Sequence, residues 1–364
     1  MEELNIAHID THTYWRGGQR QVIELIKGLN KLHLKNVLFC RSDSKVSERA
    51  QEAGIKVIHI PLAGEWDIYS AIKIRSYIVR ERINIVHAHS SHAHTLGLMA
   101  LVKSDTCKLV VSRRVDFHIN NIISKKLKYS PAVDKIITVS DAIRRILIED
   151  GVDQERLVTI RSGFVEEEFI RDDSSKNLRS ELGLSDDNVV IVTVAALAPH
   201  KAHNVLLKAA SLVVKKHPNV RFLLAGEGEL KDTITKNIYN LGLENFVILL
   251  GYIKDIGSVY KAADIFALSS CEEGLCTSLF DAMYFELPIV ATNAGGIPEL
   301  VSDGINGLIV PVEDYELFAE KLNLLIENPD RRKKMGDRSS DILEQNRMEK
   351  TIEKTLQVYK KLWE

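Results

Sequence analysis

The chain has 364 residues, of which 45% are hydrophobic and 27% charged, a composition typical of globular proteins. Acidic and basic residues nearly cancel, 50 against 48, and the net charge of -2 gives no basis for a nucleic-acid partner. The length exceeds what one ordinary hydrophobic core accommodates, so we expect two domains.

The amino-terminal segment and the four cysteines bear on where the protein works. The segment MEELNIAHID lacks the basic start and the apolar run of a signal peptide, and no stretch approaches the ~20 apolar residues of a membrane span. The cysteines are scattered, and no second Cys/His pair completes a zinc site. We therefore expect a cytoplasmic protein with reduced thiols, with a peripheral position on the inner face of a membrane left open.

Short apolar runs alternate with longer segments of helical periodicity along the chain. The predicted strands are 4–9, 36–40, 55–60, 83–88, 108–112, 135–139, 157–160, 189–195, 220–225, 247–250, 265–267 and 289–292. The predicted helices are 19–32, 67–82, 92–102, 141–149, 201–216, 230–241 and 315–326. Several strands are continuously apolar, as in a sheet buried on both faces, and parallel strands need helical crossovers. The alternation predicts doubly wound α/β domains, whose ligands bind at the carboxyl ends of the strands.

The rhythm breaks once, in the polar and acid-rich segment 161–187. We expect an amino-terminal domain over residues 1–171 and a second domain over 172–345, with a linker at about 171–187. The last segment, 346–364, places Ile352, Leu356, Tyr359 and Trp363 on one helical stripe, and the first domain is a plausible surface to cover it.

Two glycine turns follow predicted strands. Gly17 and Gly18 open the first helix and permit amides to point outward toward a phosphate. An ordinary βα turn without a ligand would have the same sequence pattern. The three spaced glycines of a dinucleotide fingerprint are absent, which counts against a dehydrogenase. Gly226 lies in a similar turn, Gly226-Glu-Gly228, after a strand of the second half.

Four histidines lie within eight residues at the end of the fourth predicted strand, at positions 87, 89, 92 and 94. Supporting carboxylates and cysteines are missing from this segment, so we favour contact of one or two imidazoles with a sugar over a metal site. His87 is alternatively a buried core histidine.

Basic residues gather farther along the first half. Arg113 and Arg114 follow the fifth strand and either bind an anion or form a surface pair. Six more bases follow, and they indicate either a solvated face or docking on anionic lipid headgroups: Lys125, Lys126, Lys128, Lys135, Arg144 and Arg145.

The segment from Cys271 to Glu299 carries the densest set of polar candidates. Glu273 and Gly274 interrupt a strand just before a predicted helix that starts near Thr277, and Asp281 lies on its first turn. A helix N-terminus suits phosphates, and carboxylates suit the hydroxyls of a sugar nucleotide. Lys201, where an earlier strand feeds a helix, is placed to meet a diphosphate.

Taken together, these residues resemble the retaining glycosyltransferases of family 4. The resemblance rests on motifs in family order over nearly the whole chain, each weak alone: Gly17-Gly18, Val139-Ser-Asp-Ala-Ile143, Ile160-Arg-Ser-Gly163, Lys201, Gly226-Glu-Gly228, Glu273-Gly-Leu, Asp281-Ala-Met, Pro288-Ile-Val-Ala291, Gly295-Gly-Ile-Pro-Glu299 and Gly304-Ile-Asn-Gly307. It implies the GT-B fold, two facing Rossmann-like domains with a carboxyl-terminal helix crossing back to the first.

The resemblance also implies roles at the site. Glu273, with the backbone amides of Gly274, Leu275, Cys276 and Thr277, would contact the donor sugar, and Asp281 the ribose. Lys201, with Gly17 or Gly18, would neutralise the diphosphate; His89 would lie near the reacting carbon, and Tyr252 and Ile253 near the base. The donor would be a UDP- or GDP-sugar, the acceptor a glycan or a lipid-linked glycan, and no cofactor or metal would be needed.

Two departures from the family pattern affect these roles. Asp281 replaces the second glutamate, and because it follows Ser278 by three residues it is alternatively a capping-box acid. Ala196 stands where the family commonly has a phosphate-binding arginine, flanked by alanines at two glycine positions, Ala195 and Ala202. The candidates for the missing cation are Arg16, Arg20 and Arg161.

Three functions follow in order of preference. The first is a metal-independent, hexosyl-type retaining glycosyltransferase of cell-envelope glycan or glycolipid synthesis. The second is a GT-B nucleotide-sugar epimerase, and the third a degenerate transferase that only binds a nucleotide sugar. Donor base, sugar, acceptor, linkage and oligomeric state are not readable from the sequence.

Overall fold

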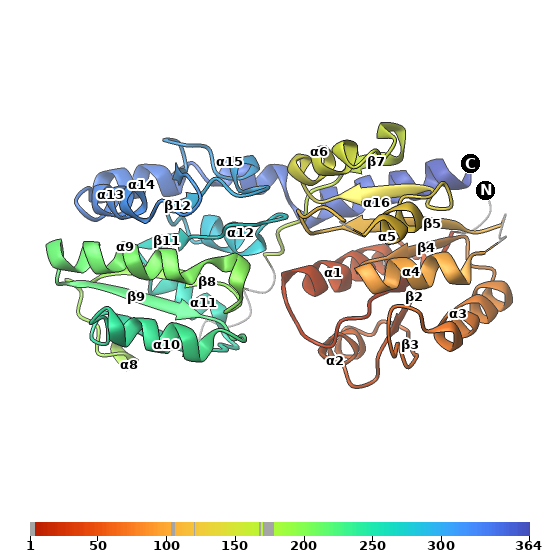
Figure 1. The fold of residues 1–364 in the computed structure, drawn as a ribbon, viewed down its shortest axis with the longest axis horizontal. Helices are drawn as coiled ribbons and strands as arrows, with labels where there is room; N and C mark the ends of the chain where they lie inside the picture. Colours follow the sequence, from red (N-terminus) through yellow and green to blue (C-terminus); the bar gives the residue numbers. More distant parts are fainter. Residues whose placement is uncertain (1–3, 103–105, 120, 167–168, 170–177) are drawn as a thin grey trace. The chain divides into compact units, whose positions relative to one another are not determined.

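The computed structural model describes residues 4–102, 106–119, 121–166, 169 and 178–364. The chain divides into two compact units (Figure 1). The first unit comprises Met1–Gly163 and Asn346–Glu364, and the second Phe164–Gln345. Of the expected linker, residues 171–177 lie outside the described part of the chain.

The first unit is built on a parallel sheet with strand order β3-β2-β1-β4-β5-β6-β7. Its strands are β1 (Asn5–Ile9), β2 (Lys35–Cys40), β3 (Val57–His59), β4 (Ile85–Ala88), β5 (Lys108–Arg113), β6 (Lys135–Thr138) and β7 (Leu157–Thr159). Every residue of β4 is buried, including His87, as expected for a strand of a sheet that is covered on both faces.

Helices cover both faces of this sheet. They are α1 (Gly17–Lys31), α2 (Lys45–Glu52), α3 (Ile68–Glu81), α4 (Ser91–Ala100), α5 (Ile122–Lys128), α6 (Asp141–Glu149) and α16 (Met348–Trp363). Local sequence sets several starts, since the side chains of Asp67, Ser90 and Ser140 accept hydrogen bonds from the first-turn N–H groups of α3, α4 and α6. The prediction omitted α2 and α5, which are eight and seven residues long and span only about two helical turns each.

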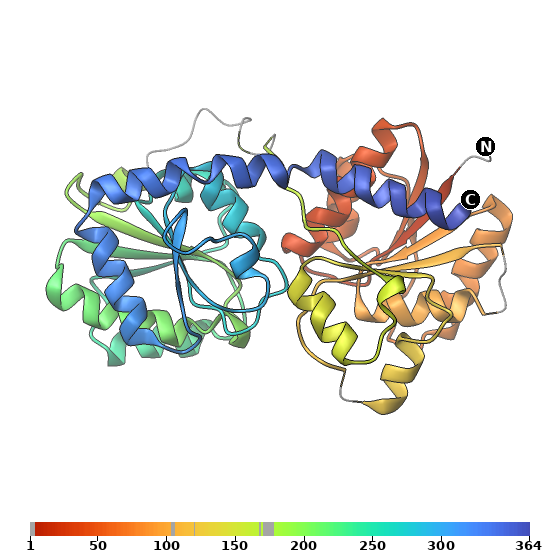
Figure 2. The same cartoon turned by 90° about the horizontal axis from the view of Figure 1, so that it is seen from above.

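Helix α16 belongs to the first unit and packs against α1 (Figure 2). Gly28 permits the close approach, because a Cβ there would lie 2.1 Å from Cδ1 of Ile352. Tyr359 is fully buried, and its hydroxyl lies 2.5 Å from Nδ1 of His87 on β4. The carboxyl-terminal helix thus completes the core of the unit in which the chain begins.

The second unit has a parallel sheet of order β10-β9-β8-β11-β12-β13. Its strands are β8 (Val189–Val194), β9 (Val220–Ala225), β10 (Val247–Gly251), β11 (Ile265–Leu268), β12 (Ile289–Thr292) and β13 (Gly307–Val310). Its helices are α8 (Leu178–Glu181), α9 (His203–Lys216), α10 (Lys231–Asn240), α11 (Ile256–Lys261), α12 (Thr277–Tyr284), α13 (Tyr315–Ile326), α14 (Pro329–Asp337) and α15 (Ser340–Gln345). Phe222, Phe318 and Leu322 centre its core. The prediction lacked β13, a four-residue strand that starts with glycine.

The expected fold class, paired doubly wound α/β domains, is confirmed by these two parallel sheets. Within the described residues, no helix combines the length and apolarity needed to cross a membrane.

Candidate active site

The start of α12 in the second unit has no side-chain cap in the described part of the chain. Cys276 occupies the N-cap position without a side-chain hydrogen bond to the first turn, and that turn carries no acidic residue. The first-turn amides and the positive end of the helix dipole therefore suit an anion. Gly274, Leu275, Cys276 and Thr277, the residues expected to supply amides, form this approach to the helix.

Glu273 and Lys201 are brought together beside this helix start. Nζ of Lys201 donates to both carboxylate oxygens of Glu273, at 2.9 Å to Oε2 and closer to Oε1. Their side chains are 13% and 8% exposed, so the ion pair is largely withdrawn from water. Lys201 ends a short 3-10 helix, Pro199–Lys201, rather than beginning α9 as predicted. The pair joins the carboxyl ends of β8 and β11, as expected for a ligand site.

Asp281 lies on α12 and is buried, with 6% of its surface exposed. The alternative of a Ser278–Asp281 capping box is wrong, because the helix begins at Thr277 with Cys276 as N-cap. Ser278 is consequently inside the helix, and its hydroxyl lies 3.0 Å from Sγ of Cys276.

Gly226 is required by the fold of its turn. Its φ is +144°, and a Cβ would lie 1.9 Å from the carbonyl oxygen of Ala195. The glycine thus lets the turn after β9 pass close to the segment that leads to Lys201. Tyr252 and Ile253, after β10, are 59% exposed and half-buried respectively.

The glycine turn of the first unit opens α1. Gly17 and Gly18 are the first two helical residues, and Arg16 at the N-cap position makes no side-chain cap. Cδ of Arg114 lies 3.5 Å from the position of a Cβ on Gly18, so that guanidinium stem packs on the turn. Arg114 is partly buried, with its Nε withdrawn from solvent, and desolvation lowers its pKa to about 10. The even choice between surface pair and ligand-binding base is thus resolved against an exposed surface pair.

His89 is held by a relay of buried polar groups that sequence reasoning missed. The Nδ2 amide of Asn36 donates to the carbonyl of Leu34 at 2.9 Å, which turns its Oδ1 toward Nε2 of His8 at 3.2 Å. Nε2 of His8 must therefore carry the hydrogen, and its Nδ1 accepts from Nε2–H of His89 at 3.0 Å. Nδ1 of His89 is left as a hydrogen-bond acceptor.

That Nδ1 is buried and, among the described residues, has no hydrogen-bond partner. Burial and the neighbouring histidines hold the pKa of His89 well below its usual value, so the ring is neutral. Asp10 Oδ2, Gln19 Oε1 and Arg114 Nε are likewise buried without a partner in the described part of the chain. Buried polar atoms are normally satisfied, so this group at the strand ends indicates a place for a polar ligand.

A second polar pair near the turn also escaped prediction. Oδ1 of Asp10 lies 2.9 Å from both the backbone N and Nδ1 of His12. Asp10 is fully buried at the end of β1, while the His12 side chain is 29% exposed. The only available signal was their position directly after the first strand, because their pairing depends on the shape of the loop.

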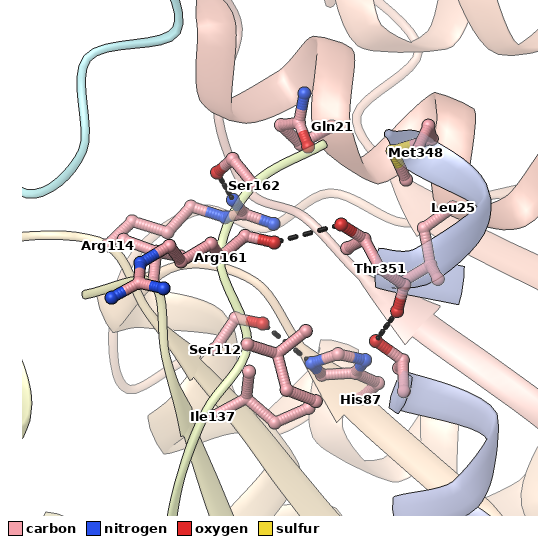
Figure 3. A pocket seen from close by; sticks show the side chains of 13 residues that line it. Gln21, Leu25, His87, Ser112, Arg114, Ile137, Arg161, Ser162, Met348 and Thr351 are labelled. Carbon is pink, nitrogen blue, oxygen red and sulfur yellow. Dashed lines mark hydrogen bonds between the residues drawn. The ribbon is translucent and has the colours of Figure 1, made fainter. Parts of the chain in front are cut away.

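His87 is a core residue, as the alternative interpretation held. Besides Tyr359, it lies 2.8 Å from Oγ of Ser112 through Nε2. A cavity of about 20 Å³ beside it, between β5, the segment 160–162 and α16, has room for roughly one water and not for a sugar (Figure 3).

One group in the described residues could offer three metal ligands, His8, His87 and His89, whose ligand atoms lie within 4.8 Å of one another. Both nitrogens of His8 and of His87 already lie within hydrogen-bond distance of other side chains. A metal would have to displace several of these bonds, so the group is better described as a hydrogen-bonded relay.

The candidates for the missing cation lie in the first unit. Arg161 forms an ion pair with Asp141 at 3.2 Å, and Arg16 stacks on Tyr14 at 4.5 Å from the ring centroid. Neither geometry assigns a replacement for Ala196.

Comparisons with known proteins agree with this geometry. Residues 15–168 match the family model described as Glycosyltransferase Family 4, and residues 174–341 match the one described as Glycosyl transferases group 1. The UDP-Gal:alpha-D-GlcNAc-diphosphoundecaprenol alpha-1,3-galactosyltransferase of Escherichia coli is 24% identical over 88% of this chain and 87% of its own length.

Two further relatives differ in extent. Glycosyltransferase EpsD of Bacillus subtilis is 29% identical over 50% of this chain, and the match spans about half, 48%, of that protein. The crystal structure of HepE of Anabaena in complex with UDP superposes with a TM-score of 0.86 at 22% identity, covering 98% of this chain and 100% of that one. These matches confirm the GT-B fold. The chain belongs to the family 4 type of glycosyltransferases, which transfer a sugar from a nucleotide-sugar donor.

Proposed function

We propose that the protein transfers a hexosyl unit from a UDP-sugar to a hydroxyl of a lipid-linked glycan, with retention of configuration and without a metal ion. The observation that carries the proposal is the withdrawn Lys201–Glu273 pair beside the uncapped start of α12. A carboxylate for sugar hydroxyls, a cation for phosphate and free amides meet there in one unit.

On the donor side, the second unit takes the nucleotide sugar. Glu273 accepts hydrogen bonds from hydroxyls of the transferred sugar, and Lys201 and the amides of α12 stabilise the diphosphate that leaves. Asp281 binds the ribose, and Tyr252 and Ile253 contact the base. A UDP donor is favoured because the galactosyltransferase relative is named for UDP-Gal and the HepE structure contains UDP. No finding favours a GDP-sugar.

On the acceptor side, the first unit supplies the other polar groups. Nδ1 of His89 accepts a hydrogen bond from a sugar hydroxyl, since the relay leaves that nitrogen without a hydrogen. His12, oriented by Asp10, lies on the loop between β1 and α1, and the amides of Gly17 and Gly18 belong to the first turn of α1. A lipid-linked acceptor is supported by the galactosyltransferase relative, whose name contains a diphosphoundecaprenol acceptor. A cytoplasmic protein in peripheral contact with an anionic membrane would meet such an acceptor.

Thermal-shift measurements with a panel of UDP- and GDP-sugars test the donor. A bound nucleotide sugar raises the unfolding temperature by linkage, and the best UDP-hexose is expected to shift it most. A larger shift with a GDP-sugar would overturn the choice of base.

The reaction is tested by NMR with that donor and a lipid-linked glycan acceptor. We expect the new glycosidic bond to have the same anomeric configuration as the donor. Turnover should be unchanged in EDTA, because Lys201 and backbone amides supply the positive charge. Conversion of the donor into an epimer without acceptor would identify an epimerase instead. Donor binding without either reaction would identify a binding protein.

A further inference from the structure

Helix α3 of the first unit exposes large apolar side chains to solvent. Ile68, Tyr69, Ile72 and Val79, together with Trp66 just before the helix, are between 58% and 71% exposed. Single exposed apolar residues are ordinary, but a concentration of them on one element marks an interaction surface.

The exposed residues form a continuous stripe. Ile68, Ile72 and Val79 are spaced by four and seven residues, so they lie above one another on a helix. The opposite side of α3 is already buried in the core of the unit through Ala71, Ile74, Tyr77 and Ile78. The helix is therefore apolar on two sides, although only one of them is covered by the fold.

The charge around the stripe is basic. Arg75 lies within it, although one of its guanidinium nitrogens donates to the carbonyls of Ala100 and Val102 at 3.1 and 2.7 Å. Lys73 and Arg80 flank the stripe on the side of Tyr69, with Nζ of Lys73 at 4.6 Å from the Tyr69 ring centroid. The nearby acids are engaged. Asp67 accepts from the N–H groups of Ser70 and Ala63, and Glu81 pairs with Arg80 at 3.0 Å.

One end of helix α5 is linked by an ion pair to the segment that precedes α3. Lys128, at its end, forms an ion pair of 2.7 Å with Glu65, the neighbour of Trp66. At its other end, about 9 Å away along the axis, Ile122 and Ile123 are 70% and 76% exposed. Figure 1 shows α4 between α3 and α5, and α4 contacts both.

The basic run that suggested lipid docking in the sequence is only partly available. Lys128 is buried against Glu65, Lys125 pairs with Asp150 at 2.7 Å, and Lys135 donates to the carbonyl of Glu155 at 2.6 Å. Lys126 is exposed. The candidate for a lipid-binding surface is therefore α3 rather than the lysines of that run.

We propose that the α3 face docks on an anionic lipid surface; this face comprises Trp66, Ile68, Tyr69, Ile72, Lys73, Arg75, Val79 and Arg80, extended by Ile122, Ile123 and Lys126 of α5. Aliphatic side chains enter the boundary between headgroups and acyl chains, Trp and Tyr occupy the headgroup level, and the bases meet lipid phosphates. A second copy of the chain fits less well, because a symmetric contact would set these bases against themselves.

The face lies close to the sheet edge that carries the acceptor-side residues. Oε1 of Glu65 accepts from Oγ1 of Thr95 at 2.8 Å, and Thr95 lies in the first half of α4, which begins directly after His89 and Ser90. Resting on the proposed function, this placement means that the surface that binds the lipid also presents the lipid-linked acceptor to His89.

Co-sedimentation of the full chain with vesicles tests the proposal. Binding is expected to vesicles of phosphatidylglycerol with phosphatidylcholine, to weaken as salt is raised, and to be poor with phosphatidylcholine alone. The variant Trp66→Ala/Ile68→Ser/Ile72→Ser should bind vesicles at least about tenfold more weakly than the wild type. The variant Lys73→Glu/Lys126→Glu should lose the part of the vesicle affinity that depends on salt.

Matched controls come from the second unit. Tyr239→Ser/Ile305→Ser removes side chains that are 72% and 55% exposed, and Lys333→Glu/Lys334→Glu reverses two exposed lysines on α14; both should bind vesicles like the wild type. Wild-type protein that ignores anionic vesicles, or an α3-face variant that binds them unchanged, would overturn the proposal. A wild-type dimer that the α3-face variant dissociates would assign the face to a second copy instead.

Two readouts separate this proposal from the proposed function. Binding of UDP and turnover of a short-chain, water-soluble acceptor should be the same in wild type and α3-face variants. Turnover of the acceptor embedded in vesicles should fall in the variants alone. If the wild type turned over neither the water-soluble acceptor nor the embedded one, the transferase assignment would be contradicted. The vesicle-binding result would then test the α3 face independently.

Discussion

Lys201 and Glu273 each depend on the other for compensation of their charge. Either charge alone would be poorly solvated, because only about a tenth of each side chain meets water. Together they neutralise each other, and in the proposed function phosphate oxygens and sugar hydroxyls replace them as partners when the donor binds. Their effects on binding and on stability are therefore expected to be coupled.

Lys201→Ala and Glu273→Ala should each lower turnover at least tenfold, about 1.4 kcal/mol of barrier. Each should also destabilise the fold by roughly 3 kcal/mol, since it leaves an unpaired charge in a withdrawn site, and the double variant should lose less stability than the sum. Steady-state kinetics and urea unfolding measure both. The exposed pair Glu320–Lys321 on α13 is the control, with an expected loss below about 1 kcal/mol. Wild-type turnover in both single variants would contradict the site.

The relay Asn36–His8–His89 makes a prediction about a hydrogen atom. In ¹⁵N NMR of the folded protein, His89 should be neutral with its hydrogen on Nε2. Asn36→Leu removes the acceptor that orients His8, so the tautomer of His89 should become mixed and turnover should fall severalfold with donor affinity unchanged. Ser47→Ala, which removes the 2.8 Å hydrogen bond to His59, is the control. An Nδ1–H tautomer in the wild type would refute the derived role.

At the scale of elements, α16 is joined to β4 by one buried hydrogen bond. The pKa of Tyr359 is raised well above its usual value by burial, so its hydroxyl stays protonated and bonds to His87. Tyr359→Phe should cost about 1–2 kcal/mol of unfolding free energy, because Nδ1 of His87 keeps its burial and loses its partner. Urea unfolding measures the loss. Tyr239→Phe, at an exposed position, should be neutral, and an equally neutral Tyr359→Phe would show that the contact contributes nothing.

The connection from β8 to α9 contains an alanine in a left-handed conformation. Ala202 has a φ of +46°, at one of the positions where the family has glycine. Ala202→Gly should stay within about 0.5 kcal/mol of the wild type, because relief of roughly 1–2 kcal/mol of strain offsets the lost methyl and the added chain entropy. Ala198→Gly, in extended backbone and similarly buried, should lose about 1 kcal/mol or more. Equal losses in thermal unfolding would contradict the strain.

At the scale of the whole molecule, buried histidines are distributed unevenly. Burial lowers the pKa of His8 to about 4 and of His94 to about 3, and holds those of His87 and His89 well below their usual value, all in the first unit. In the second unit, burial lowers the pKa of His203 to about 4. As the pH falls, these histidines become protonated in the unfolded chain at a higher pH than in the folded chain. Protonation therefore opposes folding mainly in the first unit.

Stability should accordingly be fully present above about pH 6.5 and fall as the pH drops from 6.5 toward 4, by about 1.4 kcal/mol per pH unit for each such histidine. Hydrogen exchange at about pH 7 and about pH 5, followed separately in the two units, measures this. Protection should fall more in the first unit. Equal losses in both units would mean that other groups dominate the acid response.

Local pattern was enough to predict most of the architecture. Apolar runs such as Ile265–Leu268 are buried on both faces, and helical periodicity between such runs indicates parallel crossovers. The same periodicity could not detect β13 or α5, which are too short to show a pattern. For the site, strand ends followed by glycines or bases indicated two sheet edges as candidates, because parallel strands place their carboxyl ends together.

The sequence by itself thus determined two α/β domains, the sheet edges that carry the candidate site residues and, through ordered motifs, the family. Tertiary structure decided the partners. Lys201 meets Glu273 across 72 residues, His89 meets His8 across 81, and Tyr359 meets His87 across 272. It also showed that Lys128 is buried while Ile68 and Ile72 face solvent. The reason is physical: local periodicity reports which side of an element is apolar, whereas strand order and helix packing select what lies opposite it.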